Sequence, residues 1–155
     1  MILEKIFNDI CDELSCDLSL CQKCNGHDGV EKAVLGVIQK YLNNKKLSLT
    51  VICNNQITSA ESVCVFGRRK SPDIVIKNEG EPFIAIEVKL RNTNDWKLSR
   101  AIGQAITYSA KYPYGIIFIQ DSFDKNRLVR HDYDEYILSS LRERYNIKLI
   151  VRYDC

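Results

Sequence analysis

The sequence is poor in the features that mark membrane, disordered or strongly basic proteins. Proline and glycine number only 3 and 7 among 155 residues, and no apolar run approaches a membrane span, which needs roughly 20 residues. The net charge is only +2, so nucleic acid would have to bind a local basic patch. With 45% hydrophobic and 27% charged residues, we expect residues 1–155 to form one globular domain that does not bind membranes.

Cysteine, in contrast, is abundant, with 7 residues. The odd number argues against a fully paired disulfide framework of a secreted protein. The first residues, MILEKIFNDICDEL, mix acids with apolar residues and lack the basic segment and cleavage site of a signal peptide. We therefore expect an intracellular, cytoplasmic protein.

Residues 1–27 are predicted to form an N-terminal helix, over Ile2–Leu14, followed by a Cys-rich connector. Cys16, Cys21 and Cys24 have the spacing C-x4-C-x2-C. The Cys21–Cys24 pair suits half of a Zn²⁺ site, and the triple spacing also occurs in iron–sulfur proteins. Free thiols, or one disulfide, are the third interpretation, and the sequence leaves all three open. His27 is most simply a polar loop residue.

Two runs rich in Ile and Val, Asp73–Lys77 and Phe83–Leu90, flank a short segment with glycine and proline, which predicts a β-hairpin. Side chains alternate along a strand. One face of the second strand then holds Ile84, Ile86, Val88 and Leu90, and the other holds Phe83, Ala85, Glu87 and Lys89. Asp73, at the start of the first strand, is expected to place a second carboxylate beside the first.

Two carboxylates next to a lysine suit phosphoryl chemistry. Mg²⁺ prefers oxygen ligands and is typically held by one or two carboxylates together with a substrate phosphate. A metal so held activates water and polarises the phosphate, and a fixed lysine offsets negative charge that develops in the reaction. The hairpin therefore predicts metal-dependent hydrolysis of phosphodiester bonds.

Pro72-Asp73, thirteen further residues and then Glu87-Val88-Lys89 resemble the signature of the PD-(D/E)xK nuclease superfamily, which includes restriction endonucleases, archaeal Holliday-junction resolvases and RecB-like nucleases. Gln104 and Tyr108 resemble the QxxxY element of the RecB-like branch. The resemblance implies an α/β fold with a restriction-endonuclease-like core, in which helices flank a mixed central sheet in the order αβββαβ. It also implies a Mg²⁺- or Mn²⁺-dependent deoxyribonuclease.

The resemblance further implies roles for single residues. Asp73 and Glu87 would hold the metal, joined by the Val88 carbonyl and by Glu31 on the first core helix. Lys89 would assist the attacking water, and Gln104, counted among the catalytic residues, would act with Tyr108 to position the substrate or Lys89. For Glu31 a second interpretation stays open, since Asp28-Gly-Val-Glu31 also fits a helix capping box.

Basic residues lie near these positions in the sequence. Arg68, Arg69 and Lys70 precede Asp73 in a predicted loop, where they would bind phosphates without reading bases. Arg100 and Tyr108 share a helical flank with Gln104 and are predicted to face nucleic acid. Solvated surface positions are the alternative for both groups.

The remaining elements follow from hydrophobic periodicity. Helices are predicted over Asp28–Leu42, Asp95–Tyr112 and Tyr133–Tyr145. Strands are predicted over Leu47–Cys53, Gly115–Gln120 and Ile147–Tyr153, with Val63–Phe66 pairing with the first of these. Asp121–Arg130 is predicted to be a loop.

A small core without a recognition domain fits branched, single-stranded or end-containing DNA better than a long specific sequence. A homodimer would let two sites cut opposing strands. Two other classes of function stay open. One is a catalytically inactive nucleic-acid-binding module, in which Glu87 and Lys89 form a surface ion pair. The other is a zinc or iron–sulfur interaction protein.

Overall fold

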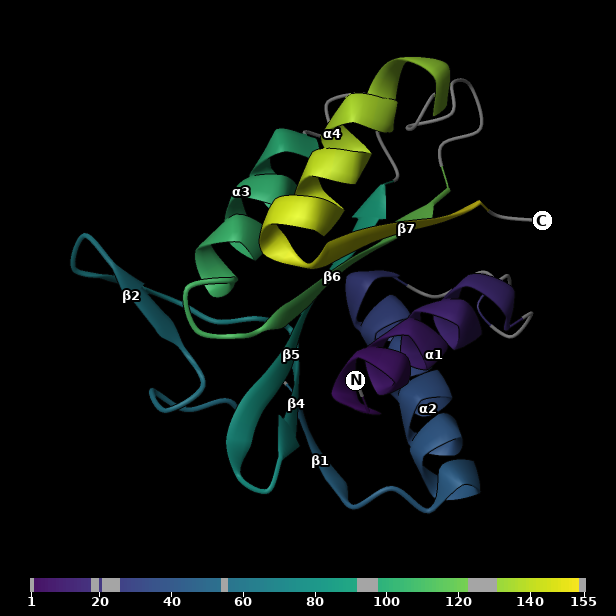
Figure 1. Cartoon of the computed structure of the whole chain (residues 1–155), viewed down its shortest axis with the longest axis vertical. Helices are drawn as coiled ribbons and strands as arrows, with labels where there is room; N and C mark the ends of the chain where they lie inside the picture. Colours follow the sequence, from purple (N-terminus) through teal and green to yellow (C-terminus); the bar gives the residue numbers. More distant parts are fainter. Residues whose placement is uncertain are drawn as a thin grey trace.

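The computed structural model describes residues 2–17, 20, 26–53, 56–91, 98–122 and 131–153. Within these residues the protein is a mixed α/β fold, in which helices cover both faces of a five-stranded sheet (Figure 1). The elements are α1 (Ile2–Cys16), α2 (Gly26–Lys45), β1 (Leu49–Cys53), β2 (Val63–Val65), β3 (Arg68–Lys70), β4 (Ile74–Asn78), β5 (Glu81–Arg91), α3 (Leu98–Tyr108), β6 (Tyr114–Asp121), α4 (His131–Tyr145) and β7 (Ile147–Tyr153).

The main sheet has the strand order β1-β4-β5-β6-β7. Its first three strands are antiparallel, and β5, β6 and β7 are parallel to one another. Apart from β2 and β3, the elements from α2 to β6 follow the predicted order αβββαβ. The strand predicted over Ile147–Tyr153 is confirmed with the same bounds.

The predicted β4–β5 hairpin is confirmed. Glu79 and Gly80 have φ values of 51° and 86°, as a two-residue type I′ turn requires. Ile76 pairs with Ile84 and Lys77 pairs with Pro82, so the register skips Phe83. Because of this bulge, Phe83 joins Ile84 in the same core cluster. The prediction that Phe83 shares a face with Ala85 is therefore wrong.

Both faces of the sheet are buried. α1 and α2 pack on one face, against residues such as Ile86, Val88 and Phe118. α3 and α4 pack on the other, against Ile117 and Ile119. A strand buried on both sides favours apolar residues on both faces, which explains the run of four apolar residues, Ile116–Ile119, in the middle of β6. Among the described helices, none has the length and apolar character that crossing a membrane would require.

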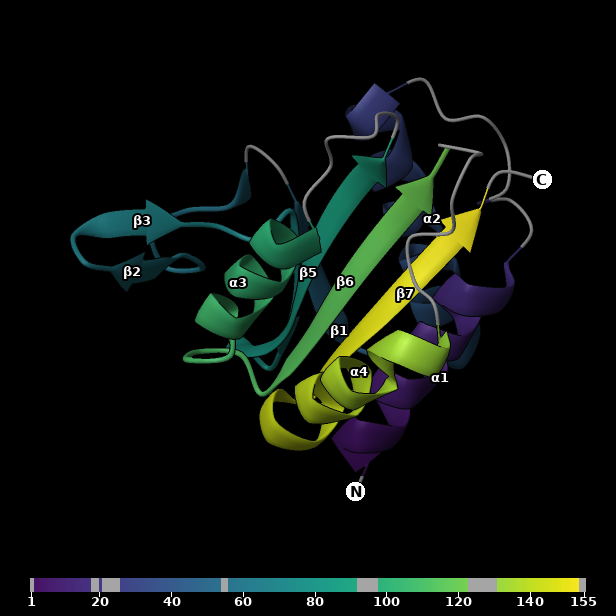
Figure 2. The ribbon, with the colours of Figure 1, turned by 90° about the horizontal axis from the view of Figure 1, so that it is seen from above.

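The segment Val63–Lys70 differs from prediction. β2 pairs with β3 in a separate two-stranded sheet, and the partner of β1 is β4. Phe66 and Gly67, with φ values of 48° and 72°, form the tight turn that lets β2 pair locally. The predicted pairing of Val63–Phe66 with Leu47–Cys53 is therefore wrong, and Arg68–Lys70 is a strand and not a loop. Figure 2 shows this hairpin projecting from the body of the protein.

Other predicted bounds change by a few residues. The helices predicted over Ile2–Leu14, Asp28–Leu42 and Tyr133–Tyr145 lie within α1, α2 and α4. The helix predicted over Asp95–Tyr112 is observed as α3, and residues 92–97 are outside the described part of the chain. Most of the predicted Asp121–Arg130 loop, residues 123–130, also falls outside it.

Candidate functional site

The candidate site lies where β5 extends past β4. Ile74, the first residue of β4, pairs with Ile86, whereas β5 continues to Arg91 along β6. Pro72 lacks an N–H group and cannot continue the backbone ladder. Asp73 instead contacts β5 with both its backbone and its side chain. Its N–H donates to the Ile86 carbonyl at 3.1 Å, and its Oδ2 accepts the Val88 N–H at 2.7 Å.

The Lys89 ammonium group lies among three oxygen atoms at this edge. Its Nζ donates to Glu87 Oε1, lies 3.5 Å from Asp73 Oδ2 and is 3.1 Å from the Val88 carbonyl oxygen. The Glu87 side chain is only 1% exposed, whereas those of Asp73 and Lys89 are each 21% exposed. The predicted convergence of Asp73, Glu87 and Lys89 is therefore observed, and the cluster reaches solvent through Asp73 and Lys89.

Burial and the negative charge of Asp73 shift the pKa of Glu87 in the same direction. Burial raises the pKa of the Glu87 carboxyl above its usual value, and the neighbouring Asp73 charge raises it further. The positive charge of Lys89 and hydrogen bonds from Lys89 and Tyr108 oppose this rise in pKa. Two neighbouring carboxylates, one of them buried, gain from additional positive charge. The electrostatics therefore favour binding of a cation.

Tyr108 fixes Glu87 from the α3 side. Its hydroxyl lies 3.0 Å from Glu87 Oε2 and 2.8 Å from the Ser71 carbonyl oxygen. Burial raises the pKa of Tyr108, so the phenol keeps its proton and can donate it to a hydrogen bond. A nucleic-acid-binding role was predicted for this tyrosine, but it is buried and its hydroxyl is used inside the protein. Tyr108 is therefore a positioning residue for Glu87.

Gln104 lies beside Tyr108, one helical turn earlier on α3. A hydrogen bond from the Gln104 side chain lowers the pKa of the Tyr108 phenol and so opposes the effect of burial. The Gln104 Oε1 atom is buried, and no hydrogen-bond partner for it is found in the described part of the chain. A buried acceptor without a partner is costly, so this amide oxygen is suited to a further donor at the site.

His27 joins the cluster from α2, although it was predicted to be a loop residue. Because α2 begins at Gly26, His27 lies in its first turn, four residues before Glu31 on the same face. His27 Nε2 lies 2.8 Å from the Val88 carbonyl oxygen, and Nδ1 lies 2.9 Å from Glu31 Oε1. Asp28 is inside the helix and not at its N-cap, so the capping-box interpretation of Glu31 is wrong.

His27, Asp28 and Glu31 form a second group of donors. One ligand atom from each of them lies within 4.8 Å of the others. Glu31 is buried and Asp28 is exposed. His27 and Lys89 share the Val88 carbonyl as an acceptor, so this group adjoins the Asp73–Glu87 pair. Sequence reasoning missed His27, and the available signal was its i, i+4 spacing to a glutamate on a helix.

The predicted phosphate-binding residues lie on the surface. Arg68, Arg69 and Lys70 are all exposed on β3, which leads within three residues to Asp73. Arg100 is exposed in the first turn of α3. Of the predicted cysteine ligands, Cys16 is an exposed free thiol at the end of α1, whereas Cys21 and Cys24 are outside the described residues.

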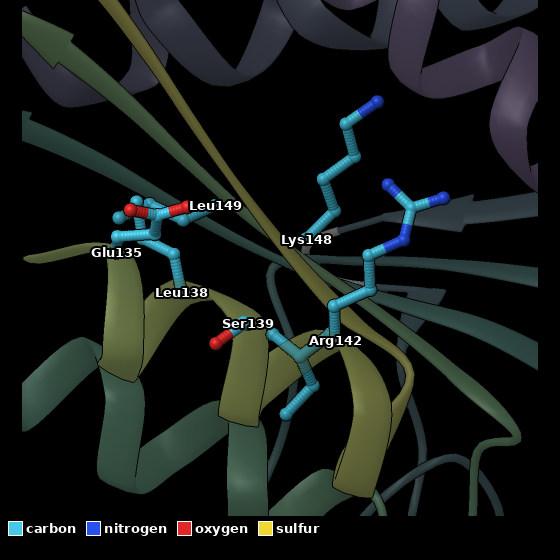
Figure 3. A pocket seen from close by; sticks show the side chains of 7 residues that line it. Glu135, Leu138, Ser139, Arg142, Lys148 and Leu149 are labelled. Atoms are coloured by element: carbon cyan, nitrogen blue, oxygen red, sulfur yellow. The ribbon is translucent and has the colours of Figure 1, made fainter. Parts of the chain in front are cut away.

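A cavity of about 430 Å³ lies elsewhere, between α4 and β7 (Figure 3), and it is lined by Glu135, Leu138, Ser139, Arg142, Ile147, Lys148 and Leu149. Its charged groups do not converge. Lys148 pairs with Asp12 on α1 at 3.4 Å, and Arg142 lies 3.4 Å from Asn8 Oδ1 on the same helix. Figure 3 shows Glu135 well apart from both cations. This cavity therefore lacks the chemistry of the Asp73–Glu87–Lys89 cluster.

The cluster at the edge of β5 supplies the donors that a hard divalent cation prefers. Asp73 and Glu87 offer carboxylate oxygens, and Val88 offers a carbonyl oxygen on the same side. A partly exposed lysine lies next to them. Such an arrangement can bind a metal ion and place a cation against a phosphate. No family model, curated protein or solved structure matches the chain.

Proposed function

We propose that this protein is a metal-dependent deoxyribonuclease of the PD-(D/E)xK superfamily, with a restriction-endonuclease-like core. One observation carries the proposal. The oxygens of Asp73, Glu87 and Val88 converge on a single positively charged nitrogen, Lys89 Nζ. These three residues are the ligands expected from the sequence signature, and they meet at an edge that is partly open to solvent.

The donor set fits Mg²⁺ or Mn²⁺. Asp73, Glu87 and the Val88 carbonyl supply only oxygen atoms, which these ions prefer. His27 and Glu31 would extend the set from α2, where His27 contacts the Val88 carbonyl and Glu31 contacts His27. When bound, such an ion supplies Lewis-acid polarisation of the scissile phosphate. The raised pKa of Glu87 beside Asp73 supports the need for a cation here.

The chain's own residues supply the rest of the chemistry. Lys89, anchored beside the two carboxylates but partly exposed, orients the attacking water and offsets the growing charge on the phosphate. The water oxygen bonds to phosphorus, one ester P–O bond breaks, and the leaving oxygen gains a proton. Tyr108 holds Glu87, and the Val88 N–H holds Asp73, so both carboxylates are in place before substrate binds.

The inactive binding module has weaker support. It treats Glu87 and Lys89 as a surface ion pair, but Glu87 is 1% exposed. A buried carboxylate that faces a second carboxylate costs stability, and such groups cluster at functional sites. The exposed cations of β3 lie close in sequence to Asp73 and suit phosphate contacts without base specificity. Branched, single-stranded or end-containing DNA is therefore the proposed substrate class.

A cleavage panel tests the proposal. Junction, flap, duplex and single-stranded DNA are incubated with Mg²⁺, with Mn²⁺ or with EDTA, and strand scission is measured. We expect cleavage only with added metal, and its loss in Asp73→Asn. The matched control is Asp12→Asn, an exposed carboxylate on α1, which should cleave normally. Absence of cleavage on every substrate with both metals, or equal loss in the two variants, would overturn the proposal.

A further inference from the structure

The β2–β3 hairpin, Val63–Lys70, carries a fully exposed aromatic side chain at its tip. Phe66 is 101% exposed, the largest exposure among the large hydrophobic side chains of the described residues. Phe66 also has a φ of 48°, a backbone conformation that bulky residues rarely adopt. A tight turn would be more stable with Asn or Gly at this position. Neither packing nor turn geometry therefore explains a phenylalanine here.

The hairpin is also strongly basic. Val63–Lys70 contains Arg68, Arg69 and Lys70, all exposed, and no acidic residue. Residues directly opposite in an antiparallel pair share a face. Arg68 lies opposite Val65 and Arg69 lies opposite Cys64, so cations occupy both faces of the ribbon. An apolar tip flanked by cations complements a polyanion with flat apolar groups, which describes the bases and backbone of nucleic acid.

The base of the hairpin is fixed by hydrogen bonds, although its tip is exposed. Ser62 Oγ and Ser71 Oγ lie 2.8 Å apart across the base, and the Tyr112 hydroxyl donates to the Glu61 carbonyl at 2.5 Å. Lys111 Nζ donates to the Ser62 carbonyl at 3.1 Å. The Ser71 carbonyl also lies 2.8 Å from the Tyr108 hydroxyl, which contacts Glu87. The hairpin is thus an arm anchored directly beside the candidate site.

We propose that Phe66 stacks on an exposed base of DNA whose stacking is interrupted, while Arg68, Arg69 and Lys70 bind the flanking phosphates. This inference rests on the proposed nuclease function and defines its substrate as DNA with a gap, nick, flap or junction. Stacking of a base on an aromatic side chain tolerates any sequence, because every base has a flat face. An intact duplex offers no such face without the cost of unstacking.

The chain length limits the distance between this contact and the cut. Phe66 precedes Asp73 by seven residues, and a fully extended chain of that length spans at most about 25 Å. Successive nucleotides of one strand rise 3.4 Å along B-form DNA, so this reach corresponds to roughly seven nucleotides. Cleavage is therefore expected within about seven nucleotides of the interruption.

A binding experiment without added divalent metal separates this inference from catalysis. Affinities for gapped and intact duplexes are measured for the wild type, Phe66→Ala, Phe66→Trp and Tyr136→Ala. Tyr136 is the matched control, because it is a 77% exposed aromatic residue on α4. We expect Phe66→Ala to bind the gapped duplex about 5- to 100-fold more weakly, whereas Phe66→Trp and Tyr136→Ala bind as the wild type does.

Equal affinity of Phe66→Ala and wild type for gapped DNA would overturn the stacking role, even if cleavage is observed. Tight, Phe66-dependent binding without any metal-dependent cleavage would support stacking and contradict the nuclease. A loss of affinity equal for gapped and intact duplexes would also contradict selection of interrupted DNA.

Two native thiols provide a second readout. Cys64 and Cys16 are both exposed and free, and Figures 1 and 2 place the hairpin and α1 on opposite sides of the protein. We expect gapped DNA to slow alkylation of Cys64 but not of Cys16, measured by mass spectrometry of the peptides. Protection of Cys64 by vesicles of anionic lipid, with none by DNA, would overturn the proposal in favour of a lipid surface.

Discussion

Glu61 and Glu87 are both buried carboxylates paired with a lysine, yet their pKa values shift in opposite directions. Glu61 Oε2 accepts the backbone N–H and the hydroxyl of Thr58, at 2.9 and 2.6 Å, and Oε1 lies 3.2 Å from Lys77. These hydrogen bonds lower the pKa of Glu61 to about 2. For Glu87, burial and the negative charge of Asp73 outweigh Lys89 and raise the pKa.

The opposite pKa shifts distinguish Glu61, a structural carboxylate, from Glu87, which is suited to a functional role. Glu61 has a complete set of partners at the base of the β2–β3 hairpin, so its charge is stabilised within the protein alone. Glu87 lies near a second carboxylate, Asp73, and burial together with that negative charge raises its pKa. A buried carboxyl group whose pKa is raised beside a second carboxylate, at a partly open edge, is typical of ligand sites. The first expectation is therefore that Glu87 controls activity and Glu61 controls stability.

Replacing each glutamate by glutamine tests this contrast, with the largest expected effect at Glu87. The Glu87→Gln change keeps the shape of the side chain but removes its charge, and should lower metal-dependent cleavage about 100- to 1000-fold. Glu61→Gln should cleave DNA within about twofold of the wild type once corrected for its folded fraction. Turnover rates and circular dichroism of both variants provide the measurement. Equal losses of activity would remove the distinction.

A second test concerns the contribution of His27 to metal affinity. His27 links Glu31 to the Val88 carbonyl, so His27→Ala should raise the Mn²⁺ concentration for half-maximal cleavage about 10- to 100-fold. The control is Gln39→Ala, an exposed and uncharged position farther along α2, which should leave this concentration unchanged. An unchanged Mn²⁺ requirement in His27→Ala would show that the histidine is only a structural contact.

Prediction from sequence succeeded where local periodicity decides the outcome. The apolar alternation of Phe83–Leu90 was enough to predict that Glu87 and Lys89 share a face, because a strand permits only two faces. It failed for Phe83, since a bulge depends on the register of the partner strand. It failed for His27 for a similar reason. The spacing to Glu31 was a local signal, but the other partner of His27 is a carbonyl 61 residues away, and no local pattern encodes that contact.

The partner of β2 was also not predictable from the local sequence, because β1 and β3 were both available to pair with it. Val63–Phe66 has the apolar character of a core strand, but the Phe66-Gly67 turn makes a partner available at once. Closing a short loop costs less entropy than closing a long one. The neighbouring place in the main sheet is taken by β4, which forms its own tight hairpin with β5.

Acid denaturation provides a smaller test of the same contrast. The folded-state pKa of Glu61, about 2, lies below its ordinary value of 4.5. The ionised group therefore stabilises the fold above about pH 5, and this contribution is lost as the pH falls from 5 toward 2. After allowance for solvent screening at partly exposed Lys77, we expect ionised Glu61 to contribute about 1–2 kcal/mol to the free energy of unfolding. Urea unfolding measures the free energy of unfolding at pH 7 and at pH 3. The decrease from pH 7 to pH 3 should be smaller for Glu61→Gln than for the wild type. Equal losses would contradict the assignment.

Two buried tyrosines allow the finest comparison, because both hydroxyls contact the base of the hairpin but only that of Tyr108 also contacts Glu87. Tyr108 contacts the Glu87 carboxylate at 3.0 Å, and Tyr112, four residues later, donates to the Glu61 carbonyl at 2.5 Å. Each Tyr→Phe change removes only that oxygen. Tyr108→Phe should lower kcat about three- to tenfold at unchanged KM, because the hydroxyl positions Glu87 and touches no substrate.

Tyr112→Phe should leave kcat unchanged and lower the free energy of unfolding by about 1 kcal/mol, because it removes a hydrogen bond at the base of the hairpin. Steady-state kinetics and urea unfolding of both variants measure the two effects. If the two changes affected kcat and stability alike, the hydroxyls would serve packing alone. A selective effect of Tyr108 on kcat would show that the α3 face of β5 is organised around Glu87, since the two tyrosines otherwise share burial, chemistry and neighbourhood.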